Sequence, residues 1–170
     1  MMAQLTTQPV PADSLLARRI RPGDYADCFV VEVDSTVSLG EFITAFYSSA
    51  AFRTERTALA LLGRYATAED IAALAQGQTD SFAAWDVEER TIDQLLMRDF
   101  LGKTRSWLSV EPVAGRDATV LRFGSWVGAR AERDGAVTGN RLSLITNLAY
   151  PFHRAYSRLL LAGAVRHLAR

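Results

Sequence analysis

The sequence predicts an α+β domain in which a long C-terminal helix closes over a curved antiparallel sheet. Strand-like segments follow one another with short turns through the middle of the chain. Helical segments are gathered before this run, and residues 142–170 carry one long amphipathic pattern after it. Strands linked by hairpins, with the helices kept apart from them, are typical of α+β proteins and not of doubly wound α/β proteins.

The composition is that of one ordinary globular domain. The chain has 170 residues, of which 49% are hydrophobic and 22% charged, and this size allows a substantial core. Its 19 basic and 19 acidic side chains cancel, so net charge gives no reason to expect nucleic acid or an anionic membrane as a partner. We recognise no signal peptide and no membrane-spanning segment, which predicts a cytoplasmic protein. Cys28, the single cysteine, is expected to be a small buried hydrophobe.

The first part of the chain is expected to supply an arm and a strand. Residues 1–13 are polar and contain proline, so we expect a flexible N-terminal arm before a single domain of residues 14–170. Pro22, Gly23 and Asp24 indicate a turn. The β-branched and aromatic residues of the segment 25–33 predict the first strand.

Three helical segments are expected next. Ser38 and Glu41 have the spacing of a capping box, in which each side chain satisfies a free amide at the start of a helix, and apolar residues follow at helical spacing. A second helix is expected over residues 54–62. Thr67 is expected to begin a third helix, which ends at Gly77.

An alternating pattern then predicts four more strands, over residues 82–91, 92–100, 104–113 and 118–129. Simple alternation places Trp85, Val87 and Glu89 on one face of their strand. It also makes Arg105 and Trp107 point the same way.

The C-terminal helix is expected to hold both histidines against the domain. At 100° per residue, Tyr156 and His167 lie within about 80° of His153, on the apolar side. The two histidines are 14 residues apart, or roughly 21 Å along a helix, so they cannot share one metal ion. Pro151 either kinks this helix or begins a new one.

Two segments resemble a known family. Asp24-Tyr25-Ala26-Asp27 and Tyr150-Pro151-Phe152-His153-Arg154 are similar to motifs of a bacterial family, domain of unknown function 2867 (DUF2867). The resemblance implies a helix-grip fold similar to the START and birch-pollen-allergen (SRPBCC) superfamily, in which a curved antiparallel sheet wraps around a long C-terminal helix and leaves a cavity. Members bind lipids, hormones or polyketides, and a few are enzymes. It implies no catalytic residue for this chain.

The candidate ligand-binding residues are those expected to face such a cavity. The sequence contains no phosphate-binding loop, metal-spaced cluster, cofactor motif or nucleophile motif that we recognise. We therefore consider polar and aromatic side chains on the predicted inner faces: His153, Tyr156, Trp85, Trp107, Trp126, Arg105 and Glu89.

Each of these candidates has a structural alternative. The tryptophans could line a ligand wall or belong to a core or an interface. His153 could transfer protons or be a hydrogen-bonded structural residue. Arg105 could receive a ligand carboxylate or form an ion pair with Glu89. Asp27 could pair with His153 or with an arginine.

These expectations lead to a binding module that holds a small, mostly apolar molecule between the sheet and the C-terminal helix. Two other functions stay open. One is an enzyme on the same scaffold, with His153 and Glu89 or Asp27 as acid and base. The other is a protein-interaction domain with a filled core, which could form a homodimer.

Overall fold

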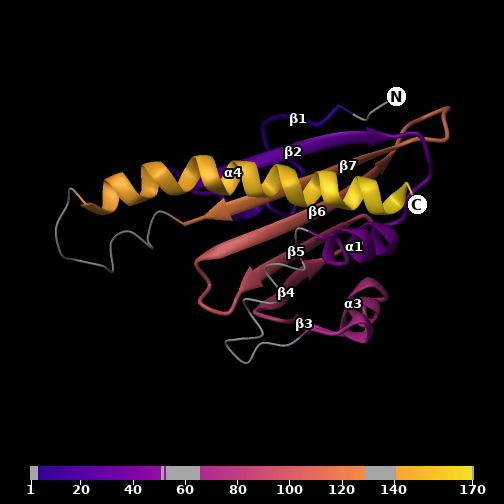
Figure 1. Ribbon diagram of the computed structural model, residues 1–170, viewed down its shortest axis with the longest axis horizontal. Helices are drawn as coiled ribbons and strands as arrows, with labels where there is room; N and C mark the ends of the chain where they lie inside the picture. Colours follow the sequence, from indigo (N-terminus) through magenta and orange to yellow (C-terminus); the bar gives the residue numbers. More distant parts are fainter. Residues whose placement is uncertain (1–3, 51, 53–65, 129–140, 170) are drawn as a thin grey trace.

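The structure, a computed structural model, describes residues 4–50, 52, 66–128 and 141–169, with side chains in all of these except 141–153. Within these residues, seven strands form one antiparallel sheet, and α1 and α4 pack against the same side of it (Figure 1). The strands are β1 (Thr6–Thr7), β2 (Tyr25–Val33), β3 (Ser81–Phe82), β4 (Trp85–Arg90), β5 (Gln94–Asp99), β6 (Thr104–Pro112) and β7 (Thr119–Val127). The helices are α1 (Leu39–Tyr47), α3 (Ala68–Ala75) and α4 (Arg141–Leu168), with a 3-10 turn, η1 (Ala17–Arg19).

The strand order in the sheet is β1-β2-β7-β6-β5-β4-β3. The strands from β3 to β7 are consecutive neighbours, whereas β2 pairs with β7, so that Tyr25 lies opposite Val127 and Val33 opposite Thr119. The α+β class and all five strands expected from the sequence are confirmed. The sequence patterns missed β1 and β3, because strands of two residues are too short to show a period-2 alternation.

The two faces of the sheet have different coverings. We call the face that carries α1 and α4 the inner face. The core on this side joins aliphatic and aromatic residues of the strands to both helices, and the rings of Phe46 and Phe123 lie 4.8 Å apart between their centroids. At its centre are Phe29, Leu95, Leu108, Leu121, Phe42 and Leu161, all at most 1% exposed.

The outer face is covered by the chain before β2, residues 4–24, which we call the N-terminal strap. Leu15 and Leu16 of the strap form a second apolar cluster with Cys28, Trp107 and other outer residues of the strands. The described part of the expected flexible arm is attached here: β1 pairs with β2, and the backbone N of Gln8 donates to the carbonyl oxygen of Cys28 at 3.0 Å. The expectation of a loose arm is therefore wrong for residues 6–8.

The helix boundaries follow the predicted capping residues. Ser38 and Glu41 form the expected capping box at the start of α1. Thr67 forms a second box with Asp70 at the start of α3. Gly77 follows α3 with φ +70°, a conformation that glycine adopts without strain. The helix expected over residues 54–62 lies outside the described residues.

The C-terminal helix is a single helix that passes through Pro151, so Pro151 does not begin it. On the part whose side chains are described, Ser157, Leu160, Leu161 and Ala164 are buried. His167 is exposed, so its expected place against the core is wrong. The buried stripe is centred on the line of Ser157 and Ala164, which leaves His167 at its edge in the last turn of the helix.

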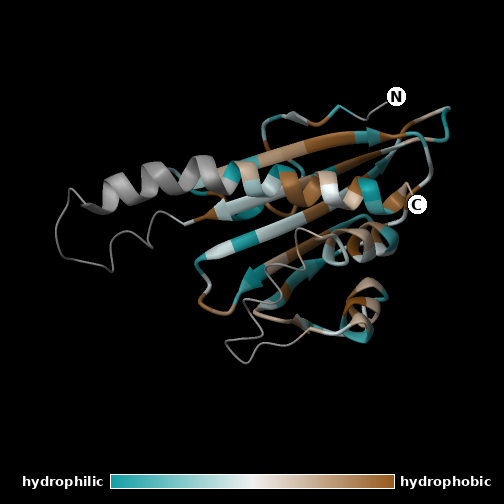
Figure 2. Cartoon of the chain, in the orientation of Figure 1, coloured by the Kyte–Doolittle hydropathy of each residue, from teal (hydrophilic) through white to brown (hydrophobic). Residues whose placement is uncertain are grey.

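Hydropathy changes along the strands of the inner core. Figure 2 shows β6 in hydrophilic or neutral colours near its start and in hydrophobic colours farther along. The start of β6 pairs with the end of β7, which in turn pairs with the start of β2. One end of the sheet is thus more polar than the end that carries the aromatic core. Among the described helices, none combines the length and the apolar character needed to cross a membrane.

Candidate functional site

Four of the predicted ligand-binding residues lie on the outer face, away from α4. Trp107 pairs with Leu96, and both belong to the cluster under the N-terminal strap. Trp126 belongs to the same cluster and pairs with Arg105. Arg105 and Trp107 do share a face, as expected, but it is not the face that the C-terminal helix covers. The prediction that Trp107, Trp126 and Arg105 line a space under α4 is therefore wrong.

Glu89 is on the outer face because β4 contains a bulge. Val87 pairs with Met97, an inner-face residue, whereas Glu89 pairs with Leu96, an outer-face residue, and the register shifts between them at Glu88. A bulge adds one residue to a strand and reverses the faces of the residues beyond it. Glu89 therefore does not share a face with Val87, contrary to the expected simple alternation.

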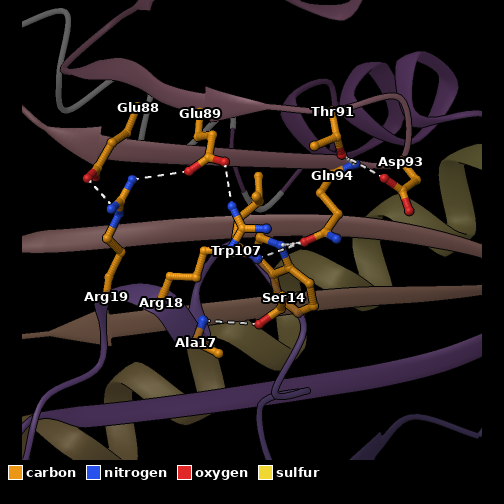
Figure 3. Close-up of polar contacts among 11 residues, drawn as sticks. Ser14, Ala17, Arg18, Arg19, Glu88, Glu89, Thr91, Asp93, Gln94 and Trp107 are labelled. Atoms are coloured by element: carbon orange, nitrogen blue, oxygen red, sulfur yellow. Dashed lines mark hydrogen bonds and ion pairs between the residues drawn. The ribbon is translucent and has the colours of Figure 1, made fainter.

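Ion pairs between these outer residues and the strap hold the strap against the sheet (Figure 3). Arg18 Nη1 lies 2.8 Å from Glu89 Oε1, and Arg19 contacts Glu88 at 3.0 Å and Glu89 at 3.1 Å. Arg105 pairs with Glu88 and not with Glu89 as expected, because the bulge turns Glu88 toward β6. The Arg105 guanidinium also lies 4.3 Å from the ring centroid of Trp126. The arginine expected to receive a ligand carboxylate is already paired within the protein.

The indole N–H groups on this face are also occupied. Trp107 Nε1 donates to Gln94 Oε1, and Trp126 Nε1 donates to Asp24 Oδ2, both at 2.9 Å. These two hydrogen bonds therefore help to hold the strap against the sheet. Gln94 carries no recognisable sequence pattern, and Asp24 was noted only for its turn and its motif and not as a partner of Trp126.

Trp85 and Tyr156 are the predicted candidates that lie on the inner side. Both are partly buried and pack against the inner core. The side chain of His153 lies outside the described residues. Glu89, its proposed acid–base partner, lies on the outer face, whereas the described side chains of α4 pack on the inner face.

The polar end of the inner face contains a carboxylate held by two hydroxyl groups. Tyr25 OH donates to Asp27 Oδ2 at 2.9 Å, and Ser125 Oγ donates to Asp27 Oδ1 at 2.6 Å. The register between β2 and β7 explains the contact with Ser125, because Asp27 lies directly opposite Ser125. Asp27 was expected to pair with His153 or an arginine, but among the described residues it forms no ion pair.

The row of inner-face residues that contains Asp27 and Ser125 continues across the sheet. Ser125 lies opposite Ser106, and Ser106 lies opposite Met97. The next row toward the core is apolar, with Phe29 opposite Phe123. A fixed, partly buried carboxylate therefore lies one row away from the aromatic core, on the face that α4 covers. We call Tyr25, Asp27 and Ser125 the Asp27 site.

One buried hydroxyl group on α4 has no hydrogen-bond partner within the described residues. Ser157 is 1% exposed, and its Oγ has no hydrogen-bond partner in the part of the chain that the structure describes. Buried polar groups are normally hydrogen-bonded, so this group can bind a water molecule or a ligand. It lies one turn before Leu160 and Leu161, which reach the inner core.

The groups described at the site are hydrogen-bonding groups. No group of three or more histidine, cysteine, aspartate or glutamate side chains with the spacing of a metal site occurs among the described residues. The Asp27 carboxylate accepts hydrogen bonds and can bind a donor or a cation. Comparisons with family models, with curated proteins and with solved structures find no match to this chain.

Proposed function

We propose that this protein binds a small, mostly apolar molecule between the inner face of the sheet and α4, with Asp27 as the anchor for a donor or cationic group. The observation that carries this proposal is the Asp27 site itself: a carboxylate fixed by two hydroxyl groups, beside an apolar row. The anchor differs from the histidine that the sequence suggested.

The chemistry of the Asp27 carboxylate determines which class of ligand we expect to bind. An ionised carboxylate only accepts hydrogen bonds, so the ligand would bring an N–H or O–H group. Among the described residues no cation pairs with Asp27, and a protonated amine would stabilise its carboxylate more than a neutral hydroxyl group. We therefore expect amines to bind better than alcohols of the same chain length, and carboxylic acids to bind worst.

The order of elements supports a helix-grip domain as the scaffold for this function. A strand and helices precede a meander, and a long helix follows and packs on the inner face. We also retain, as proposals, the relation to DUF2867 and to the START and birch-pollen-allergen superfamily, and a cytoplasmic location. The unpartnered hydroxyl of Ser157 supports a second polar contact for the ligand.

Thermal unfolding with a matched panel tests the proposal. Octylamine, octanol and octanoate would be added to the purified protein below their aggregation concentrations. We expect octylamine to raise the melting temperature most, since a ligand that binds only the native state stabilises it. Asp27→Asn should lose this preference, whereas Asp86→Asn, at an exposed position on β4, should keep it.

Native mass spectrometry provides the independent measurement. An additional mass of a few hundred daltons that is lost on denaturation, and lost in Asp27→Asn, would support a bound ligand. No additional mass and no response to any member of the panel would contradict the proposal. A mass in ultracentrifugation that rises with concentration would then favour the interaction-domain alternative.

A further inference from the structure

Two large apolar side chains are exposed side by side at the turn between β5 and β6. Phe100 is 55% exposed and Leu101 is 61% exposed. Gly102 follows with φ +68°, and its backbone N donates to the carbonyl oxygen of Asp99 at 2.8 Å. The turn is therefore a defined hairpin tip, and its apolar side chains are presented in a fixed place.

Two exposed cations flank the apolar residues of this tip. Arg98 and Lys103 flank the two apolar residues, are exposed, and form no ion pair with any residue that the structure describes. The acid of the turn, Asp99, is directed toward the backbone: its Oδ1 accepts from the N of Lys103 at 2.7 Å and of Thr104 at 2.9 Å. The tip thus presents two apolar groups between two cations that form no ion pair among the described residues, with Asp86 directly opposite Arg98 in the sheet.

We propose that this hairpin tip is a membrane-surface contact, which places Phe100 and Leu101 in the headgroup region of an anionic bilayer while Arg98 and Lys103 face its phosphates. Apolar groups gain by leaving water at this depth, and cations beside them are attracted to the negative surface potential. The zero net charge of the whole chain does not oppose this contact, because the local charge at the tip decides it.

The tip lies at the same end of the sheet as the Asp27 site. Thr104, just after the turn, pairs with Val127, and Val127 pairs with Tyr25. Contact with a bilayer would therefore bring the polar end of the inner face close to lipid. The surface contact itself does not depend on the proposed ligand, so the two proposals can fail separately.

The turn between β4 and β5 provides a matched control. Ile92 is 96% exposed there, but the neighbouring charge is Asp93, whose Oδ1 accepts from Thr91 Oγ1 at 2.6 Å. The nearest cation in β4, Arg90, donates to the carbonyl oxygens of Leu74 and Ala75. Ile92 is therefore an exposed apolar residue without free cations beside it.

Vesicle flotation with the full chain tests the contact. Vesicles of phosphatidylcholine alone would be compared with vesicles that contain about one third phosphatidylglycerol, at low and high salt. We expect binding to the anionic vesicles at low salt and its loss at high salt. The Arg98→Ser/Lys103→Ser variant should bind about 25-fold more weakly, from about fivefold (~1 kcal/mol) for each cation.

A second variant tests how much the apolar side chains contribute to vesicle binding. Phe100→Ser/Leu101→Ser should reduce binding by at least about tenfold, whereas Ile92→Ser should bind like the original chain. Circular dichroism would check that each variant is folded. No flotation with anionic vesicles at low salt would overturn the proposal and leave the tip to a protein partner. Equal binding by Phe100→Ser/Leu101→Ser and the original chain would overturn it too.

Discussion

The indole Nε1 of Trp107 donates a 2.9 Å hydrogen bond to Oε1 of Gln94. The same oxygen accepts from the backbone N of Leu15, also at 2.9 Å. One amide on β5 therefore joins the N-terminal strap to the most buried tryptophan of the sheet. This arrangement makes Gln94 the central polar residue of the outer cluster.

We expect Gln94→Ala to destabilise the protein by about 1–3 kcal/mol, because both donors would then be buried without an acceptor. Urea unfolding followed by tryptophan fluorescence measures this change. Gln78→Ala, at an exposed position after α3, is the control and should change the free energy of unfolding by less than about 0.5 kcal/mol. A similar small change for both variants would mean that water replaces the Gln94 oxygen.

Gly124 is expected to be required because the strap and β6 both approach its backbone closely. A Cβ at this position would lie 2.8 Å from Leu16 Cδ2 and 2.9 Å from Trp107 Cε3. Gly124→Ala should therefore destabilise the protein by about 1–3 kcal/mol through overpacking.

A double-mutant cycle separates this contact from a general effect of alanine. In a Leu16→Ala background, Gly124→Ala should cost less than in the original chain, since one of the two obstructing atoms is absent. Equal costs in both backgrounds, measured by urea unfolding, would show that Leu16 is not the obstacle.

The elements whose sequence signals are local could be predicted from the sequence. The segment 25–33, the capping box at Ser38 and the helix start at Thr67 depend on neighbouring residues, and all three appear as expected. The requirement for glycine at position 124 is different, because it depends on a residue far away in the chain. The close approach of Leu16, more than 100 residues away in the chain, has no sequence signal.

The candidate site was predicted less well, because it depends on which face of the sheet each side chain lies on. A single bulged residue, Glu88, reverses the face of Glu89. The strap covers Trp107 and Trp126, and its docking involves contacts far apart in the chain. Asp27 was singled out by its motif, but only the pairing of β2 with β7 reveals Ser125 as its partner.

The capping box of α1 should make the stability of the protein depend on Ser38 and on pH. The hydroxyl group and then the backbone N–H of Ser38 donate to the Glu41 carboxylate and lower its pKa. A lowered pKa stabilises the native state above the pKa of the unfolded chain, and this contribution is lost as the pH falls through the native value.

We expect Ser38→Ala to cost about 1 kcal/mol at neutral pH. The cost should become smaller in acid, where Glu41 is protonated in either variant, and NMR titration should show a higher Glu41 pKa in the variant. Ser48→Ala, at the other end of α1, is the control because its side chain is not part of the box. An unchanged Glu41 pKa in Ser38→Ala would contradict this explanation.

Cys28 should be unreactive in the native protein. Burial under the strap raises the pKa of its thiol to about 11, so almost no thiolate exists at neutral pH. We expect a disulfide reagent to label it only after unfolding or after the strap opens. This raised pKa also favours the native state below about pH 9, and that stabilisation is lost as the pH rises toward the native value.

The labelling rate of Cys28 should therefore report detachment of the strap. The Arg18→Ala/Arg19→Ala variant removes three of the ion pairs that hold it and should be labelled faster, whereas Arg166→Ala on the exposed side of α4 should not. The comparison requires conditions in which both variants stay folded. Identical rates in all three proteins would show that the ion pairs do not control access to the thiol.

The pairing of β2 with β7 also has a consequence during protein synthesis. Tyr25 leaves the ribosome about 100 residues before its partner Val127. The strands from β3 to β6 can pair as they emerge, since each one neighbours the next. The apolar residues of β2, by contrast, have only the two-residue β1 as a sheet neighbour until β7, which ends at Val127, has been made. A nascent chain stopped before β7 therefore presents the open edge of β2 that β7 later covers, which is where chaperone binding or aggregation would begin.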